Sequence, residues 1–446
     1  DQIQLRSVNA CIQFLPTLDR KALFTVEDIA LIRQQSAPES LHPVQQALVD
    51  HHASQCGFCT SGFVMSLWAM YENESQPPTR ATVTDYLSGN LCRCTGYRPI
   101  IDAAQACMND TSAKLDRSTL HNILRSLQHL PELHCQSPQG QQPFEDFFAP
   151  CQLERLAELR MTYPDARLLA GGTDLGLWVT KQGRVLNQII YLGQVAALKT
   201  LDQTDAHLRI GATVSLTDAL AAISQHYPAL ELARRFASMP IKNAGTLGGN
   251  IANGSPIGDA MPALIVLGAE LVLQQGNHTR QITLEDFYLG YQKNALQQGE
   301  FLQAILLPLP IREAADAPFH STFKFATYKI AKRYEQDISA VCAAFAVRLD
   351  AQQRIESVKI AFGGMAAIPV RATQCEAALH GQPWSAETIQ SASLALAQDY
   401  QPLSDGRASA AYRLRVAQNC LQRFFLEQQS SLAPTRLVDL IATVGV

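Results

Sequence analysis

The sequence has no apolar run long enough to cross a membrane as a helix. Its densest apolar stretch, residues 262–273, is shorter than the roughly 18 residues that such a helix needs, and it contains Glu270. A basic start followed by an apolar segment is also missing, so no secretory signal peptide is visible. These absences predict a protein that makes no membrane contact, and we expect a cytoplasmic location.

Charge of one sign and low-complexity tracts are equally scarce. Charged residues make up 17% of the chain and the formal net charge is -4, which argues against a nucleic-acid partner. Hydrophobic residues make up 47%, so intrinsic disorder is excluded as a class. At roughly 150 residues per domain, the 446 residues predict about three domains.

Cysteine, by contrast, is abundant. The chain has eleven, an odd number in a protein expected in a reducing compartment, which argues against a disulfide framework. Four of them fall within 39 residues as two close pairs, Cys56 with Cys59 and Cys92 with Cys94. Six of the scattered cysteines are interpreted as buried packing residues: Cys107, Cys135, Cys151, Cys342, Cys375 and Cys420.

Two close pairs of thiolates can surround a metal centre. Zinc and iron–sulfur clusters both accept four cysteines, so the number of ligands does not distinguish them. The single residue between Cys92 and Cys94 is tight for the usual zinc spacing, whereas each pair could hold one iron of a two-iron cluster. Gly57, Gly89 and Gly96 lie beside the pairs and allow backbone N–H groups to approach the sulfurs. An iron–sulfur site is therefore favoured over zinc and over buried structural thiols.

Two glycine-rich segments occur further along the chain. Residues 170–174 read Ala-Gly-Gly-Thr-Asp after a short apolar strand, and residues 243–259 contain a longer run rich in Gly, Asn and Thr. Neither is a Gly-x-Gly-x-x-Gly dinucleotide turn or a P-loop. Glycine lets backbone N–H groups reach phosphate oxygens, and Thr and Asn add further donors. The segments predict a phosphate-bearing cofactor, with an ordinary turn as the alternative for the shorter one.

Periodicity and turn residues predict an α+β multidomain protein. Residues 21–115 are expected to be helical, and the polar stretch 116–142 is expected to be a linker. Short strands and helices alternate over residues 143–315. Residues 318–430 are expected to begin with strands that form a hairpin and to end with helices.

The residues around the paired cysteines resemble the helical [2Fe–2S] domain of the molybdenum hydroxylases, the family of xanthine dehydrogenase and aldehyde oxidase. The resemblance rests on Gln-Cys-Gly-Phe-Cys-Thr-Ser-Gly-Phe at 55–63 and on Leu-Cys-Arg-Cys-Thr-Gly-Tyr-Arg-Pro-Ile at 91–100. It implies a four-helix domain over residues 21–115, with Gln55 toward the molybdopterin. By this likeness the ligands of one [2Fe–2S] cluster are Cys56, Cys59, Cys92 and Cys94.

The first residues resemble the end of the plant-type ferredoxin domain that precedes this helical domain in the family. The segment Ser-Val-Asn-Ala-Cys at 7–11 is similar to the part that carries the fourth cysteine of the ferredoxin cluster. Residues 1–20 would then be a remnant of that domain, with a short buried strand around the ligand Cys11. We expect the other three cysteines, and thus a second [2Fe–2S] cluster, in the intact protein.

Both glycine-rich segments resemble the FAD-binding domain of the same enzymes, which has the fold of vanillyl-alcohol oxidase. The resemblance implies an FAD-binding domain over residues 143–315 and a C-terminal α/β domain, like that of carbon monoxide dehydrogenase flavoproteins, over residues 318–430. Loop 333–339 resembles the region beside the flavin that governs NAD access. The residues that the resemblance assigns to FAD are Leu168, Ala170, Gly171, Gly172, Thr173, Asp174, Phe236, Ala237, Thr246, Gly249, Asn250, Asp259, Leu302 and Lys324.

The order of these domains resembles the iron–sulfur/FAD small subunit of bacterial xanthine dehydrogenases. The resemblance implies that hypoxanthine or xanthine is oxidised on a molybdopterin-binding large subunit, in a heterotetramer or larger assembly. This chain would pass the electrons through [2Fe–2S] to FAD and on to NAD+, without a catalytic acid, base or nucleophile of its own. The alternatives are the corresponding subunit of an aldehyde, nicotinate or carbon monoxide dehydrogenase, a free-standing flavin reductase, and a zinc-stabilised assembly protein.

Overall fold

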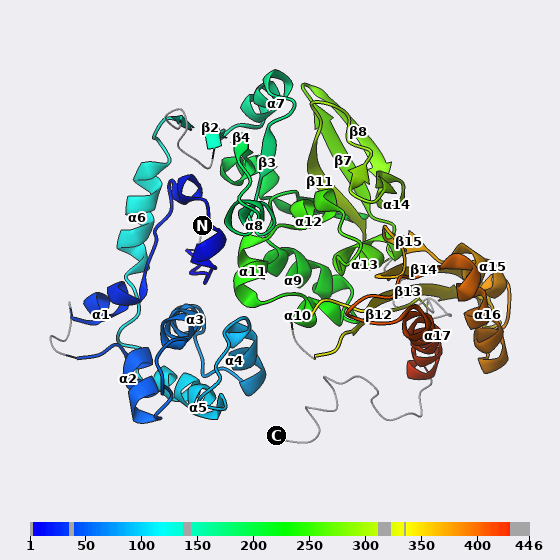
Figure 1. The fold of residues 1–446 in the computed structure, drawn as a ribbon, viewed down its shortest axis with the longest axis horizontal. Helices are drawn as coiled ribbons and strands as arrows, with labels where there is room; N and C mark the ends of the chain where they lie inside the picture. The colour runs from blue at the N-terminus through cyan, green and yellow to red at the C-terminus, as the bar shows by residue number, and fades with distance from the viewer. Residues whose placement is uncertain (1–2, 35–39, 137–143, 311–322, 334–335, 429–446) are drawn as a thin grey trace.

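The computed structural model describes residues 3–34, 40–136, 144–310, 323–333 and 336–428. They form a helical domain, a central region with two large sheets, and a C-terminal domain in which helices cover an antiparallel sheet. Figure 1 shows the helical domain and the C-terminal domain on opposite sides of the central region. The α+β multidomain organisation predicted from the sequence is thus confirmed. None of the helices in the described ranges combines the length and the apolar character needed to cross a bilayer.

The N-terminal segment lies between the helical domain and the central region. It forms two 3-10 turns, η1 (Ala10–Ile12) and η2 (Leu15–Leu18), and no strand. Cys11 is exposed, whereas Phe14 is buried in a small apolar core of the central region. The prediction of a strand around Cys11 is therefore wrong. The 3-10 turns satisfy the backbone N–H and C=O groups locally, and buried apolar side chains hold the segment in place.

Four helices form the body of the helical domain, and α1 (Val26–Gln34) precedes them. Proline at the start of α2 pre-sets the first-turn dihedral, and the His42 side chain accepts a hydrogen bond from the Val44 N–H at 3.2 Å. In α3 the fully buried Phe63, Leu67 and Tyr71 recur every fourth residue, which is the spacing of a helical core face. The four helices are α2 (Pro43–Asp50), α3 (Thr60–Asn73), α4 (Arg80–Leu87) and α5 (Arg98–Ala106).

The stretch expected to be a linker contains two regular elements. Helix α6 (Arg117–Leu127) is capped by the Asp116 carboxylate and has no buried residue. Strand β1 (Leu133–Gln136) pairs antiparallel with β2 (Phe144–Ala149) and so belongs to the first sheet of the central region. The polar composition that predicted a linker has a structural explanation. Helix α6 buries none of its residues, and β1 is an edge strand of its sheet.

The first sheet of the central region has the strand order β1-β2-β4-β3. Strand β4 (Leu186–Tyr191) pairs parallel with both β2 and β3 (Arg167–Leu169). Helix α7 (Leu153–Thr162) connects β2 to β3, and α8 (Leu175–Thr180) connects β3 to β4. The first glycine-rich segment therefore lies between the carboxyl end of β3 and the start of α8, where loops of parallel sheets commonly bind ligands.

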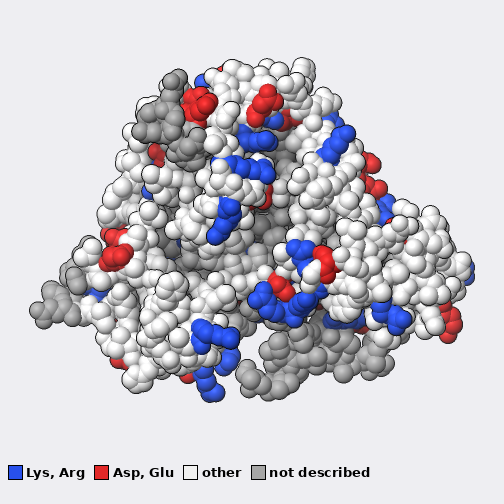
Figure 2. Space-filling model, viewed as in Figure 1, with Lys and Arg blue, Asp and Glu red and all other residues white. Residues whose placement is uncertain are grey.

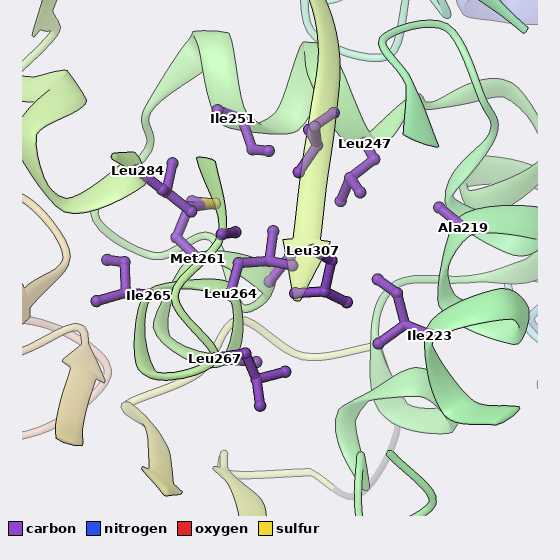
Figure 3. Packing of buried hydrophobic residues seen from close by; sticks show 14 of the residues in the cluster. Ala219, Ile223, Leu247, Ile251, Met261, Leu264, Ile265, Leu267, Leu284 and Leu307 are labelled. Carbon is purple, nitrogen blue, oxygen red and sulfur yellow. The ribbon is translucent and has the colours of Figure 1, made fainter. Parts of the chain in front are cut away.

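The second sheet is antiparallel, in the order β5-β6-β11-β7-β8, and it covers the largest apolar core. Figure 3 shows side chains of α9, α12, α13 and β11, among them Ile223, Leu247, Leu264 and Leu307, converging in that core. The strands are β5 (Leu201–Gln203), β6 (His207–Gly211), β7 (Glu270–Gln275), β8 (His278–Thr283) and β11 (Phe301–Pro308), with a separate pair β9 (Tyr288–Gly290) and β10 (Lys293–Asn294). The helices are α9 (Leu216–His226), α10 (Leu232–Arg235), α11 (Met239–Ala244), α12 (Leu247–Asn253), α13 (Ala260–Val266) and α14 (Leu284–Phe287).

The C-terminal domain packs its central strand against two different cores. Alternate residues of β13 face opposite ways: Cys342 and Ala344 join the core of the central region, whereas Val341 and Phe345 join the domain's own core. The small side chains lie toward α13 and the large ones toward the C-terminal helices. The strands are β12 (Lys324–Ile330), β13 (Val341–Leu349), β14 (Ile355–Gly363) and β15 (Val370–Arg371), and the helices are α15 (Thr373–Leu379), α16 (Ala386–Asp399) and α17 (Ala410–Glu427).

Candidate cofactor sites

The four clustered cysteines come from two loops that face each other. Cys56 and Cys59 lie directly before α3, and Cys92 and Cys94 lie between α4 and α5. The Cys56 thiol lies beside that of Cys94, and the Cys59 thiol beside that of Cys92. Each facing pair thus takes one thiol from each loop, and all four are free thiols.

The arrangement suits two metal ions better than one. A structural zinc site needs four ligands around one ion. Two facing pairs of thiols instead match a cluster of two irons held by four cysteines. The residues therefore fit a [2Fe–2S] cluster.

Local hydrogen bonds favour the thiolate form of two of the cysteines. The Thr95 side chain lies 3.1 Å from the Cys92 sulfur and its backbone N–H donates to that sulfur at 3.4 Å, which lowers the pKa of Cys92 to about 7. The backbone N–H of Phe58 lowers the pKa of Cys56. Burial raises the pKa of Cys59, and the interaction with Cys56, in which Cys94 keeps its proton, raises the pKa of Cys94. Metal ions bind the thiolate form of cysteine. Each facing pair therefore contains one thiol whose lowered pKa favours metal binding.

Apolar side chains surround the thiols at the surface. Phe58 is 94% exposed and Leu91 is 74% exposed. Tyr97 closes the second loop, because its hydroxyl accepts a hydrogen bond from the Cys92 N–H at 3.0 Å. Exposed apolar groups gathered around a prepared site are typical of a surface that another protein covers.

The two glycine-rich segments pack backbone against backbone. A Cβ atom at Gly171 would lie only 1.8 Å from the carbonyl oxygen of Ala244. A Cβ atom at Gly245 would lie 3.4 Å from the Oγ1 atom of Thr173. Glycine is required at position 171 because no side chain fits between the two backbones. The structure thus brings together the residues predicted in both segments, which we call the flavin cradle (170–174 and 243–250).

An unsatisfied acceptor lies inside the cradle. Thr246 starts α12, where its side-chain oxygen accepts the Gly249 N–H at 3.0 Å. One turn further, the Oδ1 atom of Asn250 is buried and has no hydrogen-bond partner among the described residues. A buried acceptor without a donor costs about 1–3 kcal/mol. A ligand rich in hydroxyl groups, such as the ribityl and ribose parts of FAD, would supply the donor, so the cradle fits this cofactor.

Asp259 joins the central region to the C-terminal domain through a buried ion pair. Its Oδ2 atom lies 2.5 Å from the Nζ atom of Lys329, and its Oδ1 atom accepts a hydrogen bond from the Ser339 hydroxyl at 2.6 Å. The Lys329 amine also donates to Ser339 at 3.0 Å. All three residues are buried. The end of the second glycine-rich stretch is therefore held by strand β12 and by Ser339, which lies two residues before β13.

The lysine beside Asp259 is Lys329, whereas Lys324, which the resemblance assigns to FAD, lies elsewhere on the same strand. Lys324 lies at the other end of β12, opposite Val347, and burial lowers the pKa of its amine. Five strand residues span about 17 Å, so the two lysines lie far apart. Lys329 and Ser339 escaped the sequence analysis. The available signal was a lysine within the buried strand β12, since a buried lysine needs an acidic partner.

Phe236, Ala237 and Leu302 lie outside the two cradle segments, whereas Asp174 belongs to the first. Ala237 lies two residues before α11 and adopts the left-handed φ of 49°. Leu302 is buried in the core of the second sheet. Burial raises the pKa of Asp174. Figure 2 shows lysine and arginine side chains around the hollow in the middle of this face, where an anionic pyrophosphate would be attracted.

Comparison with known proteins identifies three domains. Residues 25–105 match the [2Fe–2S] binding domain, residues 142–310 match the FAD binding domain in molybdopterin dehydrogenase, and residues 326–428 match the CO dehydrogenase flavoprotein C-terminal domain. Xanthine dehydrogenase of Emericella nidulans is 30% identical over 96% of this chain and 34% of its own length. Xanthine dehydrogenase/oxidase of Rattus norvegicus is 28% identical over 97% of this chain and 35% of its own length. The chain thus spans about a third of the length of these curated relatives.

Solved structures support the same assignment. Carbon monoxide dehydrogenase of Hydrogenophaga pseudoflava is similar with a TM-score of 0.56 and 26% identity, over 62% of this chain and 94% of that chain. Quinoline 2-oxidoreductase of Pseudomonas putida 86 has the same fold, with a TM-score of 0.56 and 22% identity, over 65% of this chain and 98% of that one. The three matched domains, the paired thiols and the flavin cradle together lead to one conclusion. The chain has the [2Fe–2S], FAD-binding and flavoprotein C-terminal domains of molybdenum hydroxylases and matches their iron–sulfur and FAD portion.

Proposed function

We propose that this chain is the electron-transfer subunit of a xanthine dehydrogenase. It would take electrons from purine oxidation at a molybdenum centre on a partner subunit, pass them through [2Fe–2S] to FAD, and deliver them to NAD+. One observation carries the proposal: the paired thiols and the flavin cradle occur in one chain, in domains that contact each other directly. When bound, the cluster and the flavin supply the redox chemistry, and the protein supplies position and environment.

The surface around the thiols supports a protein partner. The exposed Phe58 and Leu91 would lose contact with water if a molybdopterin-binding subunit covered them. The relatives that match nearly the whole chain are xanthine dehydrogenases, which supports a purine as the substrate. A substrate pocket would then lie on the partner, in agreement with the expectation that this chain holds no catalytic acid or base.

Loop 333–339 supports NAD+ as the electron acceptor. It follows Lys329 and ends at Ser339, which both bind Asp259, at the boundary between the central region and the C-terminal domain. Arg333 extends from it with a side chain that is 76% exposed, and forms a 3.0 Å ion pair with Asp337. An exposed guanidinium near this boundary could bind a dinucleotide phosphate. Tyr334 and Glu335 of the same loop lie outside the described residues.

A second substrate class is favoured by the solved structures. The similar chains with solved structures belong to enzymes that are named for quinoline and carbon monoxide. Flavin-binding domains of this kind therefore occur with several substrates, and the partner decides which one is used. The alternative is the corresponding subunit of such an enzyme, with the same cofactors in this chain.

A visible spectrum and a turnover assay test the proposal. The purified chain should show flavin bands and the broad absorption of an iron–sulfur cluster, and should oxidise xanthine only after its partner is added. Cys59→Ser should abolish the cluster absorption and leave FAD bound, whereas Cys135→Ser, remote from the clustered thiols in sequence and half-buried in β1, should change neither. A colourless zinc protein would contradict electron transfer. Turnover of an aldehyde or quinoline, with none of xanthine, would establish the alternative.

A further inference from the structure

Helix α11 touches both candidate cofactor sites. Its amino end contacts the loop that leads to Cys92, because the Met239 N–H donates to the Ser88 hydroxyl at 2.8 Å. Its carboxyl end, at Ala244, lies against Gly171 of the flavin cradle. Figure 1 shows α11 between α4 of the helical domain and α8 of the central region. Six residues of helix span about 9 Å, so this one element links the two sites by a short and rigid path.

The contact at the amino end of α11 leaves no room for a side chain. Gly89 has a left-handed φ of +94°, and a Cβ atom there would lie 2.7 Å from the Cβ and 2.9 Å from the Oγ of Ser238. Beside it, Ser88 accepts from the Met239 N–H while its hydroxyl donates to the Asp85 carbonyl at 2.7 Å. Position 89 therefore requires glycine for two reasons, the dihedral angle and the space.

The loop that leads to Cys92 is also bound to its own domain. The Asn90 amide donates to the Ser66 hydroxyl of α3 at 2.8 Å. A Cβ atom at Gly62 would lie 2.7 Å from the Asn90 oxygen, so the loop and α3 are in close contact. Helix α3 begins directly after Cys59, and Cys92 follows Asn90 by two residues. A movement at Gly89 would therefore displace both loops that carry the thiols.

We propose that Ser88 and Gly89 are positioning residues that set the spacing between the cluster loops and the flavin cradle, with α11 as the spacer. This inference rests on the proposed electron-transfer function. Electron transfer between two centres slows exponentially as the distance between them grows. A side chain at position 89 would separate the helical domain from α11 and lengthen every route that connects the paired thiols to the flavin cradle.

The first test compares two glycine variants. Gly89→Ala introduces both backbone strain and the clash with Ser238, whereas Gly381→Ala, at a φ of +71° with no atom within 4 Å, introduces the strain alone. After flash reduction of the purified protein, electron equilibration between iron–sulfur and flavin absorption should slow several-fold in Gly89→Ala and stay unchanged in Gly381→Ala. The double variant Gly89→Ala with Ser238→Gly removes the atoms that clash. It should recover most of the wild-type rate, because the Ser238 side chain makes no capping hydrogen bond.

The second test needs no cofactor. Ser88→Ala removes the acceptor of the Met239 N–H, so deuterium exchange at that amide should become about fivefold faster, the effect of losing one ordinary hydrogen bond. Gly89→Ala should have the same effect, and the double variant should restore protection. A wild-type equilibration rate in Gly89→Ala, or no recovery in the double variant, would overturn the proposal. Absence of cluster or flavin absorption in the wild type would instead refute the proposed function, while the exchange results would still report on the contact.

Discussion

The two cofactor sites are built in opposite ways. The four cluster thiols lie on two short loops at the surface of one domain, and two of them are exposed. The flavin cradle is assembled from segments about seventy residues apart that touch through their backbones, and the chain that follows it is held to another domain by the buried ion pair between Asp259 and Lys329. Local hydrogen bonds lower the pKa of two thiols at the cluster site, whereas tertiary packing brings together the two segments of the flavin cradle. Mutations should therefore damage the cradle more than the cluster loops.

The largest effect is expected where the cradle meets the C-terminal domain. Lys329→Met leaves the Asp259 carboxylate buried without its cation, which should lower the free energy of unfolding by about 3–5 kcal/mol. Lys324→Met removes an amine that is only partly buried, so it should cost less than about 1 kcal/mol. Urea unfolding followed by CD distinguishes the two. Equal losses would show that the buried pair has no special role.

The next effect is expected inside the cradle. Gly171→Ala places a Cβ atom 1.8 Å from the Ala244 oxygen, and the two segments must separate. We expect a loss of about 3 kcal/mol in unfolding free energy, together with loss of bound flavin. The ratio of flavin to protein absorbance measures the second result. A stoichiometric flavin content in this variant would mean that the segments need not touch to hold the cofactor.

A third effect concerns the pH dependence of the helical domain. Burial lowers the pKa of His42 to about 4, so folding favours its neutral form, which accepts the Val44 N–H. This contribution is complete above the ordinary pKa near 6.5 and is lost as the pH falls from there through about 4, by up to about 3 kcal/mol.

The corresponding experiment uses metal-free protein, which separates the histidine from the cluster. Its unfolding free energy is measured by urea titration at about pH 7 and about pH 4.5. His42→Asn keeps a capping side chain without a titrating ring, so it should flatten the profile. A profile as steep as that of the wild type would assign the acid sensitivity to other groups.

The smallest effect is expected in the cluster loops. Gly96 has a φ of +68° and no atom within 4 Å of the position that a Cβ would take. Gly96→Ala should therefore cost only the strain of a left-handed backbone, about 1 kcal/mol, and should keep the iron–sulfur absorption. Loss of the cluster in this variant would contradict the contrast with Gly171, since neither cofactor site would then tolerate an alanine in place of glycine.

The features that depend on neighbours along the chain could be predicted from the amino-acid sequence. Close spacing of cysteines in two loops predicted the paired thiols, and the apolar repeat of α3 predicted a buried helix, because helical spacing repeats every few residues. The glycine-rich runs identified both segments of the cradle for a similar reason: only glycine permits close approach of two backbones.

Which distant groups meet follows from the tertiary structure alone. It paired Asp259 with Lys329, crossed the cysteine pairs between the two loops, and made β1 part of a sheet where polar composition suggested a linker. It also brought Gly89 against Ser238, a contact that leaves no trace in local sequence. Such pairings depend on how strands and helices pack over long separations, and residue type at one position does not encode the identity of its partner.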